Sequence, residues 1–371
     1  MKIENVESYL IRIPFDSGGR KTWASFGTTL DYVFLRIDTD AGISGWGDAF
    51  GYGAVTATKA AVDNMIGPAL LGEDARDIAG ISYRLQQANH IWGRYGVTMF
   101  AIGGVDIALW DIAGKAAGLP VHQLLGGRST ASLPAYASLP KYQDPETVAE
   151  RTAHAVGQGY AHVKLHETEV AETAAAREAA GPDVGIMLDT NCPWSPAKAR
   201  EMAAKLAEYD LFWLEEPIFP PENFAALADL QVDTGIPIAA GENACTSWEF
   251  QQMFEAEAVS YAQPSVTKVG GISEFRKVQT LAEAANVTVV PHSPYFGPGL
   301  LATLHLIAVS PGIDIHVERL FCELGTDLYG GILDPVDGEI SLPVGPGLGL
   351  DPDPDVIEKY RATPPSGKQL Q

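Results

Sequence analysis

The chain has 371 residues, of which 46% are hydrophobic and 19% are charged, and its formal net charge is −22. This length favours two domains, or one barrel with an appendage, and the ordinary composition argues against extensive disorder. So negative a surface repels phosphate backbones and anionic lipid heads, which argues against nucleic-acid and membrane partners, and an anionic substrate would need a local positive site.

The first part of the chain is predicted to form strands. Residues 1–14 alternate between apolar and polar side chains, and 32–38 and 43–50 form a hairpin-like pair around Asp40-Ala41-Gly42. The stretch 15–31 is rich in Gly, Ser and Thr and predicts a loop.

Helices are expected next. Apolar residues recur at helical spacing between 55 and 116. Gly118 and Pro120 then close the last of these helices, because glycine favours a helix end and proline cannot continue a helix.

From about residue 131 the chain changes to short apolar strands that alternate with helices rich in Ala, Glu and Lys. We expect eight strands, at 132–137, 161–166, 184–189, 211–215, 236–241, 258–263, 287–291 and 314–318. Eight such units predict a TIM-type barrel. An open doubly wound sheet is the alternative, but no Gly-rich phosphate loop follows a strand. The tail, 331–362, is rich in Pro and Gly, and we expect it to pack on the N-terminal domain.

Acidic side chains stand at the ends of three successive barrel strands. Asp189 ends the third, Glu215 and Glu216 end the fourth, and Glu242 ends the fifth. Barrel active sites lie at these ends, where the acids would repel one another without a cation. Oxygen ligands suit Mg²⁺, whereas a single acid in such a place would more often cap a helix.

Basic side chains are expected at the same mouth. Lys164 and His166 end the second strand two residues apart, so they share one face, and His292 follows the seventh strand. Lys164 can bind a carboxylate, and His166 suits general-base work near neutral pH. Glu318 on the eighth strand also faces the mouth if the alternation holds.

This set of groups suits one kind of chemistry. A proton alpha to a carboxylate is weakly acidic, and its removal requires a base and strong stabilisation of the enediolate that forms. A divalent metal would supply most of that stabilisation, while Lys164 and a protonated Glu318 would add hydrogen bonds.

These residues lie in an ordered set of motifs that resembles the enolase superfamily, in its mandelate racemase and muconate-lactonizing branch. The resemblance spans nearly the whole chain and includes WGDAF, GVDIALWDIAGKAAGLPVHQLLGG, LDTN, WLEEP, AGEN, TKVGG, a Pro-His pair and VERL. It implies a modified (β/α)7β barrel with an α+β capping domain that the C-terminal segment completes. The boundaries would be 1–125 for the cap, 126–325 for the barrel and 326–371 for the segment that packs back.

The resemblance also implies the metal site. It assigns one Mg²⁺ per chain to Asp189, Glu215 and Glu242, and it leaves Glu216 outside the ligand set. The metal-bound form would act on a small substrate that carries a carboxylate.

For the substrate, the resemblance implies that Glu318 hydrogen-bonds its carboxylate and that loops 15–31 and 48–54 close over it. Lys164, and Asn191 at the end of the LDTN motif, are further candidate contacts of the substrate. Trp23 is a further candidate contact of the substrate. The alternative is that its segment is a solvated loop that does not contact the substrate.

Two positions depart from the family pattern. The second lysine of the usual Lys-x-Lys is His166, and the strand-six acid or lysine is replaced by Ser265. Without a charged partner, His292 is expected to act as a general acid or hydrogen-bond donor. Lys268, three residues from Ser265, is expected on the other face of the strand.

We therefore expect a metal-dependent lyase, an acid sugar dehydratase in which His166 or Lys164 takes the alpha proton and His292 protonates the leaving hydroxyl. A racemase, epimerase or cycloisomerase with the same intermediate is the alternative, and a non-catalytic relative is a third. Three cysteines, no signal segment and no apolar run of about 18 residues predict a cytoplasmic protein. The family favours homo-oligomers, either dimers or octamers.

Overall fold

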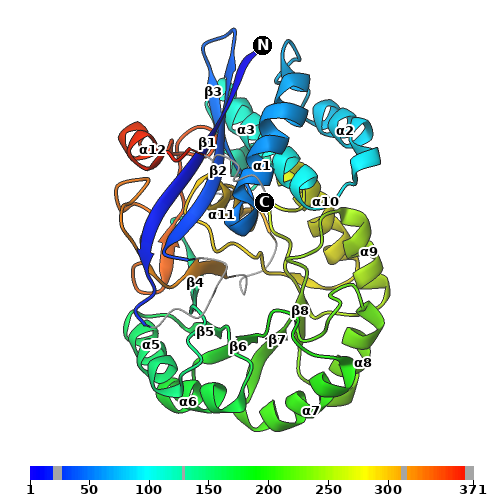
Figure 1. Ribbon diagram of the computed structural model, residues 1–371, viewed down its shortest axis with the longest axis vertical. Helices are drawn as coiled ribbons and strands as arrows, with labels where there is room; N and C mark the ends of the chain where they lie inside the picture. The colour runs from blue at the N-terminus through cyan, green and yellow to red at the C-terminus, as the bar shows by residue number, and fades with distance from the viewer. Residues whose placement is uncertain (20–26, 128–129, 311–315, 364–371) are drawn as a thin grey trace, which may run out of the picture.

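The computed structural model describes residues 1–19, 27–127, 130–310 and 316–363. Figure 1 shows an antiparallel sheet with helices at one end of the molecule and a ring of parallel strands with outer helices at the other. The candidate site residues at the carboxyl ends of the ring strands therefore face the first part of the chain.

The antiparallel sheet has the strand order β12-β1-β2-β3. Its strands are β1 (Ile3–Asp16), β2 (Thr29–Thr39), β3 (Ser44–Ala49) and β12 (Glu323–Leu324). β2 and β3 form the expected hairpin, whose register pairs Ile37 with Gly45. The loop expected at 15–31 is shorter than predicted, because β1 runs to Asp16 and β2 begins at Thr29.

Helices pack on this sheet to form the cap. They are α1 (Val55–Ala61), α2 (Ile78–Ala88), α3 (Val97–Ala117) and α4 (Val121–Leu124), joined by the short turns η1 (Tyr52–Ala54), η2 (Val62–Ile66), η3 (Gly67–Leu70) and η4 (His90–Trp92). As predicted, Gly118 ends α3 in the left-handed conformation, with φ 69°.

The α3 helix is the core of the cap. It is long and apolar enough to cross a bilayer, but 78% of its most apolar window is buried inside the protein, as expected for a core helix. Gly47 of β3 lets this helix approach closely, because a Cβ there would collide with the backbone oxygen of Gly104.

The ring is built from eight parallel strands. They are β4 (Ser132–Ser138), β5 (His162–Leu165), β6 (Gly185–Asp189), β7 (Leu211–Glu215), β8 (Ile238–Ala240), β9 (Tyr261–Ala262), β10 (Thr288–Val289) and β11 (Val317–Leu320). The order β10-β9-β8-β7-β6-β5-β4-β11 follows the chain around the ring, with β11 placed beside β4. Each predicted strand has its counterpart, although β9 and β10 are only two residues long.

Seven helices follow the first seven of these strands. They are α5 (Pro145–Gly157), α6 (Val170–Ala180), α7 (Pro196–Leu206, extended by η5, Ala207–Tyr209), α8 (Phe224–Thr234), α9 (Ser247–Glu255), α10 (Gly271–Ala284) and α11 (Pro298–Ala308). Side-chain caps begin several of them, as where Asp144 accepts a hydrogen bond from the Thr147 backbone N–H. The predicted (β/α)7β barrel with an α+β cap is confirmed.

The tail contacts both parts of the molecule. β13 (Glu339–Ser341) pairs antiparallel with β4 of the barrel, while α12 (Pro354–Tyr360) packs against β1 of the cap. The expectation that the tail packs on the N-terminal domain therefore describes its second part, where Leu348 also donates its backbone N–H to Asp111 of α3, but not β13. Pairing with β4 satisfies backbone groups that would otherwise be exposed beside the barrel.

Candidate active site at the barrel mouth

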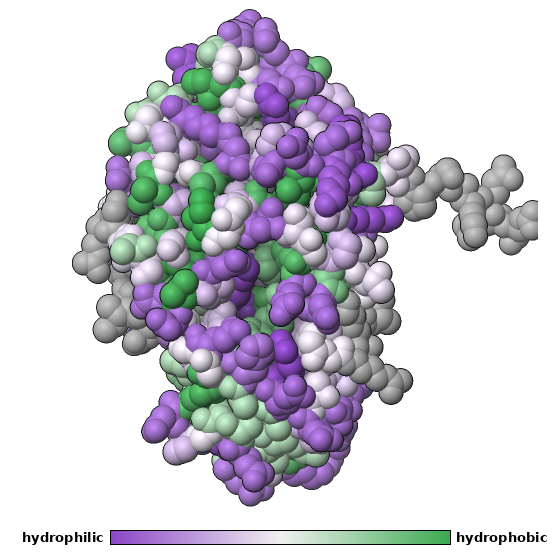
Figure 2. All heavy atoms as spheres, turned by 90° about the vertical axis from the view of Figure 1, so that its left-hand side faces the viewer, coloured by the Kyte–Doolittle hydropathy of each residue, from purple (hydrophilic) through white to green (hydrophobic). Residues whose placement is uncertain are grey.

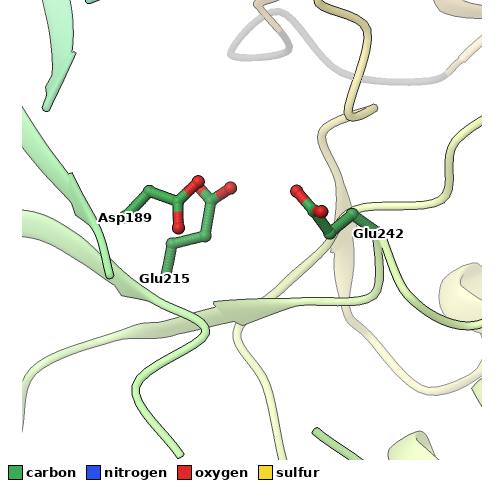
Figure 3. Close-up of side chains that lie close together, drawn as sticks. All are labelled: Asp189, Glu215 and Glu242. Atoms are coloured by element: carbon green, nitrogen blue, oxygen red, sulfur yellow. The ribbon is translucent and has the colours of Figure 1, made fainter. Parts of the chain in front are cut away.

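Three carboxylates converge at the mouth of the barrel (Figure 3). Asp189 ends β6, Glu215 ends β7 and Glu242 follows β8 by two residues. Each offers an oxygen atom, and these atoms lie within 4.8 Å of one another. Asp189 and Glu215 are buried, whereas the Glu242 side chain is 15% exposed and borders the open cavity.

Strand geometry fixes two of these acids. Met187 and Trp213 precede Asp189 and Glu215 by two residues, so each pair shares one side of its strand. Met187 and Trp213 belong to a buried apolar cluster, and the indole Nε1 of Trp213 donates a hydrogen bond of 2.9 Å to Oε2 of Glu215. The floor beneath the carboxylates thus contains an apolar cluster and a donor aimed at Glu215.

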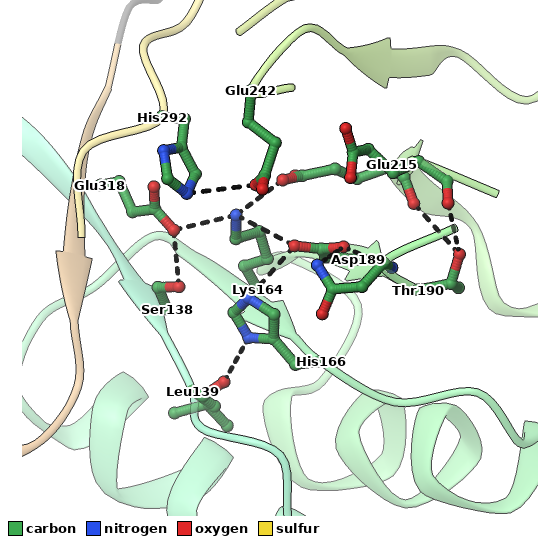
Figure 4. Close-up of polar contacts among 12 residues, drawn as sticks. Ser138, Leu139, Lys164, His166, Asp189, Thr190, Glu215, Glu242, His292 and Glu318 are labelled. Carbon is green, nitrogen blue, oxygen red and sulfur yellow. Dashed lines mark hydrogen bonds and ion pairs between the residues drawn. The ribbon is translucent and has the colours of Figure 1, made fainter. Parts of the chain in front are cut away.

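Lys164 lies at the centre of the site (Figure 4). Its Nζ is 2.8 Å from Oε1 of Glu215, 2.9 Å from Oε1 of Glu318 and 3.6 Å from Oδ2 of Asp189. Burial opposes the charged form, but Glu215 and Glu318 hold the pKa of Lys164 well above its ordinary value. Lys164 is therefore a buried ammonium ion, a poor base and a good partner for anionic oxygens.

Glu318 faces the mouth as predicted, but it is ionised. Burial would raise its pKa, yet the Lys164 ammonium and the donors around it lower the pKa of Glu318 to about 2. Ser138 donates to Oε1 at 2.8 Å, and the Ser293 backbone N–H donates to Oε2 at 2.8 Å. The expectation of a protonated Glu318 is wrong for this structure, because three donors favour its charged form.

His166 has both ring nitrogens engaged. Nδ1 lies 2.6 Å from the backbone oxygen of Leu139, and Nε2 lies 3.1 Å from Oδ2 of Asp189. A carbonyl only accepts, so Nδ1 carries a hydrogen, and Nε2 is the nitrogen on the side of Asp189. That nitrogen faces the carboxylate cluster.

His292 lies across the site from His166. Its Nε2 is 3.1 Å from Oε2 of Glu242, and its Nδ1 is 3.3 Å from the Ser265 hydroxyl and 3.4 Å from the Tyr295 hydroxyl. Burial lowers the pKa of His292, and Glu242 opposes that shift. Ser265 and Tyr295 thus occupy the place of a charged partner. No pattern in the sequence indicated the role of Tyr295.

The strand ends carry unusual backbone geometry. Asn191, Cys192 and Glu216 have φ values of 53°, 55° and 45°, in the left-handed region that costs about 1 kcal/mol or more for such residues. Asn191, which stays a predicted substrate contact, donates two hydrogen bonds of 2.9 Å, from its backbone and its side chain, to Oδ1 of Asp189. In this structure Asn191 orients a candidate metal ligand.

Lys268 reaches the site, contrary to the expectation from strand alternation. Its Nζ is 3.7 Å from Oε1 of Glu242 and 3.4 Å from Oδ1 of Asn243. β9 ends at Ala262, so the alternation of strand faces no longer applies six residues later. Asn243 also donates to both oxygens of Glu216, at 2.9 and 3.0 Å, so both oxygens of that carboxyl group are engaged.

The cap contributes to this region. The ring of Phe50 lies 4.9 Å from Nζ of Lys268, and the Tyr52 hydroxyl donates to the backbone oxygen of Pro294 at 3.4 Å. Oδ2 of Asp48 accepts a hydrogen bond of 3.3 Å from the Gly299 backbone N–H. The segment 48–54, expected to border the substrate, thus contacts the barrel beside the carboxylates.

A cavity of about 570 Å³ opens above the site. The predicted residues that line it are His166, Asn191, Glu242, His292 and Glu318, together with Tyr52, Cys192 and Glu216. Its size suits a small metabolite. Trp23 lies outside the described residues.

The donor set fits a divalent cation. Carboxylate oxygens from three strands surround one point, as hard cations prefer. Burial and the nearby carboxylates of Asp189 and Glu318 raise the pKa of Glu215, although Lys164 acts in the opposite direction. Lys164 alone therefore does not balance the negative charge of the cluster. Asp189, Glu215 and Glu242 are therefore the residues that would hold a metal.

Two family models match the chain. The model described as mandelate racemase / muconate lactonizing enzyme, N-terminal domain matches residues 21–126, and the model described as enolase C-terminal domain-like matches 147–356. Together they cover the cap helices and most of the barrel.

Characterised relatives are similar over nearly their whole length. Arabinonate dehydratase of Saccharolobus solfataricus is 31% identical, with 90% of this chain and 91% of the relative covered. D-galactarolactone cycloisomerase of Agrobacterium fabrum is 30% identical, over 98% of this chain and all of the relative. The crystal structure of 3,6-anhydro-D-galactonate cycloisomerase from Zobellia galactanivorans superposes with a TM-score of 0.84 at 31% identity, covering 98% of this chain and 100% of that one.

Proposed function

Because the chain belongs to the mandelate racemase and muconate lactonizing enzyme group of the enolase superfamily, we propose that it is a Mg²⁺-dependent acid sugar dehydratase. The observation that carries the proposal is the meeting of three carboxylates at the ends of successive strands, beside a buried ammonium group. The chemistry begins with removal of the proton alpha to the substrate carboxylate.

The substrate carboxylate would lie in the cavity beside the carboxylate cluster, within reach of Lys164. When bound by Asp189, Glu215 and Glu242, Mg²⁺ would supply positive charge that stabilises the enediolate. The Lys164 ammonium, held by Glu215 and Glu318, adds a charged donor that is oriented before the substrate arrives. Glu318, being ionised, would position Lys164 and accept a hydrogen bond from a substrate hydroxyl.

His166 is the proposed base. Its Nδ1–H is fixed on the Leu139 carbonyl, which leaves Nε2 to accept the alpha proton. Lys164 was the alternative, but its raised pKa keeps it protonated. The proton would pass from the alpha carbon to Nε2 while the electron pair moves toward the carboxylate.

His292 is the proposed acid, on the opposite side of the cavity. Its Nε2 would deliver a proton to the hydroxyl on the beta carbon, the carbon–oxygen bond would break, and water would leave. The enol that remains becomes a 2-keto acid. Ser265 and Tyr295 hold Nδ1 of His292 and fix the orientation of the ring.

Cycloisomerisation is the second candidate, and two of the similar proteins carry names of that kind. In that case the same base would open a lactone or anhydro ring, and the ring oxygen would take the place of the leaving hydroxyl. Racemisation or epimerisation would instead require His292 to return a proton to the other face of the alpha carbon.

A screen in D₂O separates these outcomes. Aldonic acids, aldaric acids and their lactones would be incubated with the protein and Mg²⁺, with keto acid measured by a colour reaction and deuterium by mass spectrometry. A 2-keto acid supports dehydration, a ring-opened isomer supports cycloisomerisation, and deuterium in an inverted substrate supports epimerisation. His292→Asn should abolish water loss while His166→Asn abolishes both water loss and alpha exchange.

Adjacent glutamates provide a matched control for the metal. Glu215→Gln should lower Mg²⁺ affinity at least tenfold, because it removes a ligand charge, whereas Glu216→Gln should change it by less than threefold. Calorimetric titration of Mg²⁺ into EDTA-treated protein measures both. Full activity after exhaustive chelation, or equal affinities in the two variants, would contradict the proposal.

The proposal includes a cytoplasmic homo-oligomer, dimer or octamer. Support for an interface comes from large apolar side chains that are exposed near η4, where Ile91, Trp92 and Tyr95 are 70%, 68% and 58% exposed. Sedimentation analysis would measure the assembly, and a monomer at micromolar concentration would contradict this part.

A further inference from the structure

A second cavity, of about 480 Å³, lies away from the carboxylate cluster. It is enclosed by α5, by the end of β11 and by the segment 321–335. Figure 2 views the side of the molecule that carries α5 and α12, and shows it hollowed near the middle with hydrophilic residues around the hollow. Leu320 borders this cavity and also the active-site cavity, so the two cavities adjoin at this residue.

Arg319 is the central polar residue of this second cavity. It follows Glu318 on β11, so its side chain leaves the opposite face of the strand from the active site. The residue is only 9% exposed, its guanidinium lies 4.1 Å from the centre of the Phe296 ring, and its Nη1 has no hydrogen-bond partner among the described residues.

The charge of Arg319 is incompletely balanced. Within the described residues its one ion pair is a long contact of 3.4 Å from Nη2 to Oδ1 of Asp334, whose side chain is 62% exposed. A buried guanidinium costs several kcal/mol unless an anion and full hydrogen bonding compensate for its lost hydration. A solvated carboxylate at that distance compensates only in part.

Arg151 brings a second guanidinium to the same cavity. It lies on α5, 5.0 Å from the centre of the Phe321 ring, and its buried Nε is also unpaired among the described residues. The buried hydroxyl of Tyr329, another lining residue, has no partner there either. Two arginines held against aromatic faces, with N–H groups left over, form an arrangement suited to a planar carboxylate.

We propose that this cavity is a binding site for a small hydroxylated monocarboxylate, separate from the active site and independent of the metal. The arginines would take the carboxylate. Asp327, Asp334 and Glu323 also line the cavity; they would accept hydrogen bonds from hydroxyls at the other end and disfavour a second negative charge.

The test uses gluconate as the probe and sorbitol as its uncharged counterpart. EDTA treatment removes the metal that would help to bind a carboxylate at the active site, and the Glu215→Gln variant identifies any binding that remains there. Calorimetry should show saturable gluconate binding at one site per chain and at least tenfold weaker binding of sorbitol. No saturable binding, or equal binding of the two compounds, would overturn the proposal.

Variants locate the binding. Arg319→Gln and Arg151→Gln should each weaken gluconate binding at least tenfold. If one of these variants fails to fold, the other is sufficient for the test. Asp334→Asn should strengthen it at least threefold, because it removes the carboxylate that competes for Arg319, an effect that a structural role would not produce. Glu215→Gln should leave it unchanged. Binding lost in Glu215→Gln but kept in Arg319→Gln would assign the heat to the active site and refute the inference.

Discussion

Replacing Trp213 by Phe tests whether the barrel floor positions the metal site. The change removes the 2.9 Å hydrogen bond to Oε2 of Glu215 and leaves the ligand itself in place. A hydrogen bond to a charged group contributes about 1.5–3 kcal/mol, and loss of such an outer contact typically weakens metal binding about 10- to 100-fold. We therefore expect the Kd for Mg²⁺ to rise by about that factor, because Glu215 would lose its orientation.

Calorimetric titration of Mg²⁺ into EDTA-treated protein measures this Kd, and urea unfolding measures stability. Trp46→Phe is the control, since Trp46 is a buried tryptophan of the cap that packs on Tyr9. Both variants should lose roughly 1–3 kcal/mol of stability from the smaller side chain. Equal Mg²⁺ affinity in the two variants would refute the reasoning, because the effect of Trp213 would then be packing alone.

Two further predictions concern buried charges. Lys164→Met should lower kcat/KM at least about 10³-fold on the substrate found in the screen. It should also destabilise the metal-free protein by about 3–5 kcal/mol, because Glu215 and Glu318 lose their shared cation. Activity within tenfold of wild type would contradict this prediction. Burial, with His122 nearby, lowers the pKa of His305 from 6.5 to about 4. The unfolded chain then binds more protons between these values, so the free energy of unfolding should fall by about 3 kcal/mol as the pH drops from 6.5 to 4. Urea unfolding at several pH values should show that the free energy of unfolding falls less steeply with decreasing pH in His305→Gln than in the wild type. The same pH dependence in both proteins would contradict this prediction.

The fold was accessible from sequence because its signals are periodic. Eight apolar segments at regular spacing predict parallel strands, and the carboxyl ends of parallel strands meet at one edge. That rule alone brought Asp189, Glu215 and Glu242 together correctly. The placement of β13 beside β4 could not be predicted, because a short strand carries no information about its partner.

Site details depended on features that alternation does not describe. Lys268 lies in a turn after a two-residue strand, so the strand rule placed it on the wrong face. Trp213 resembles any core aromatic residue until its N–H is seen to face Glu215. The ionised state of Glu318 follows from donors on β4 and near His292, which come together only in three dimensions.

The contacts of Phe50 with Lys268, Tyr52 with Pro294 and Asp48 with Gly299 mean that the two parts of the protein are not interchangeable modules. A grafted cap that lacks these three side chains would disturb the neighbours of Glu242 even if every barrel residue were kept. Evolution of new specificity along this segment is therefore constrained to changes that the barrel rim accommodates at the same time.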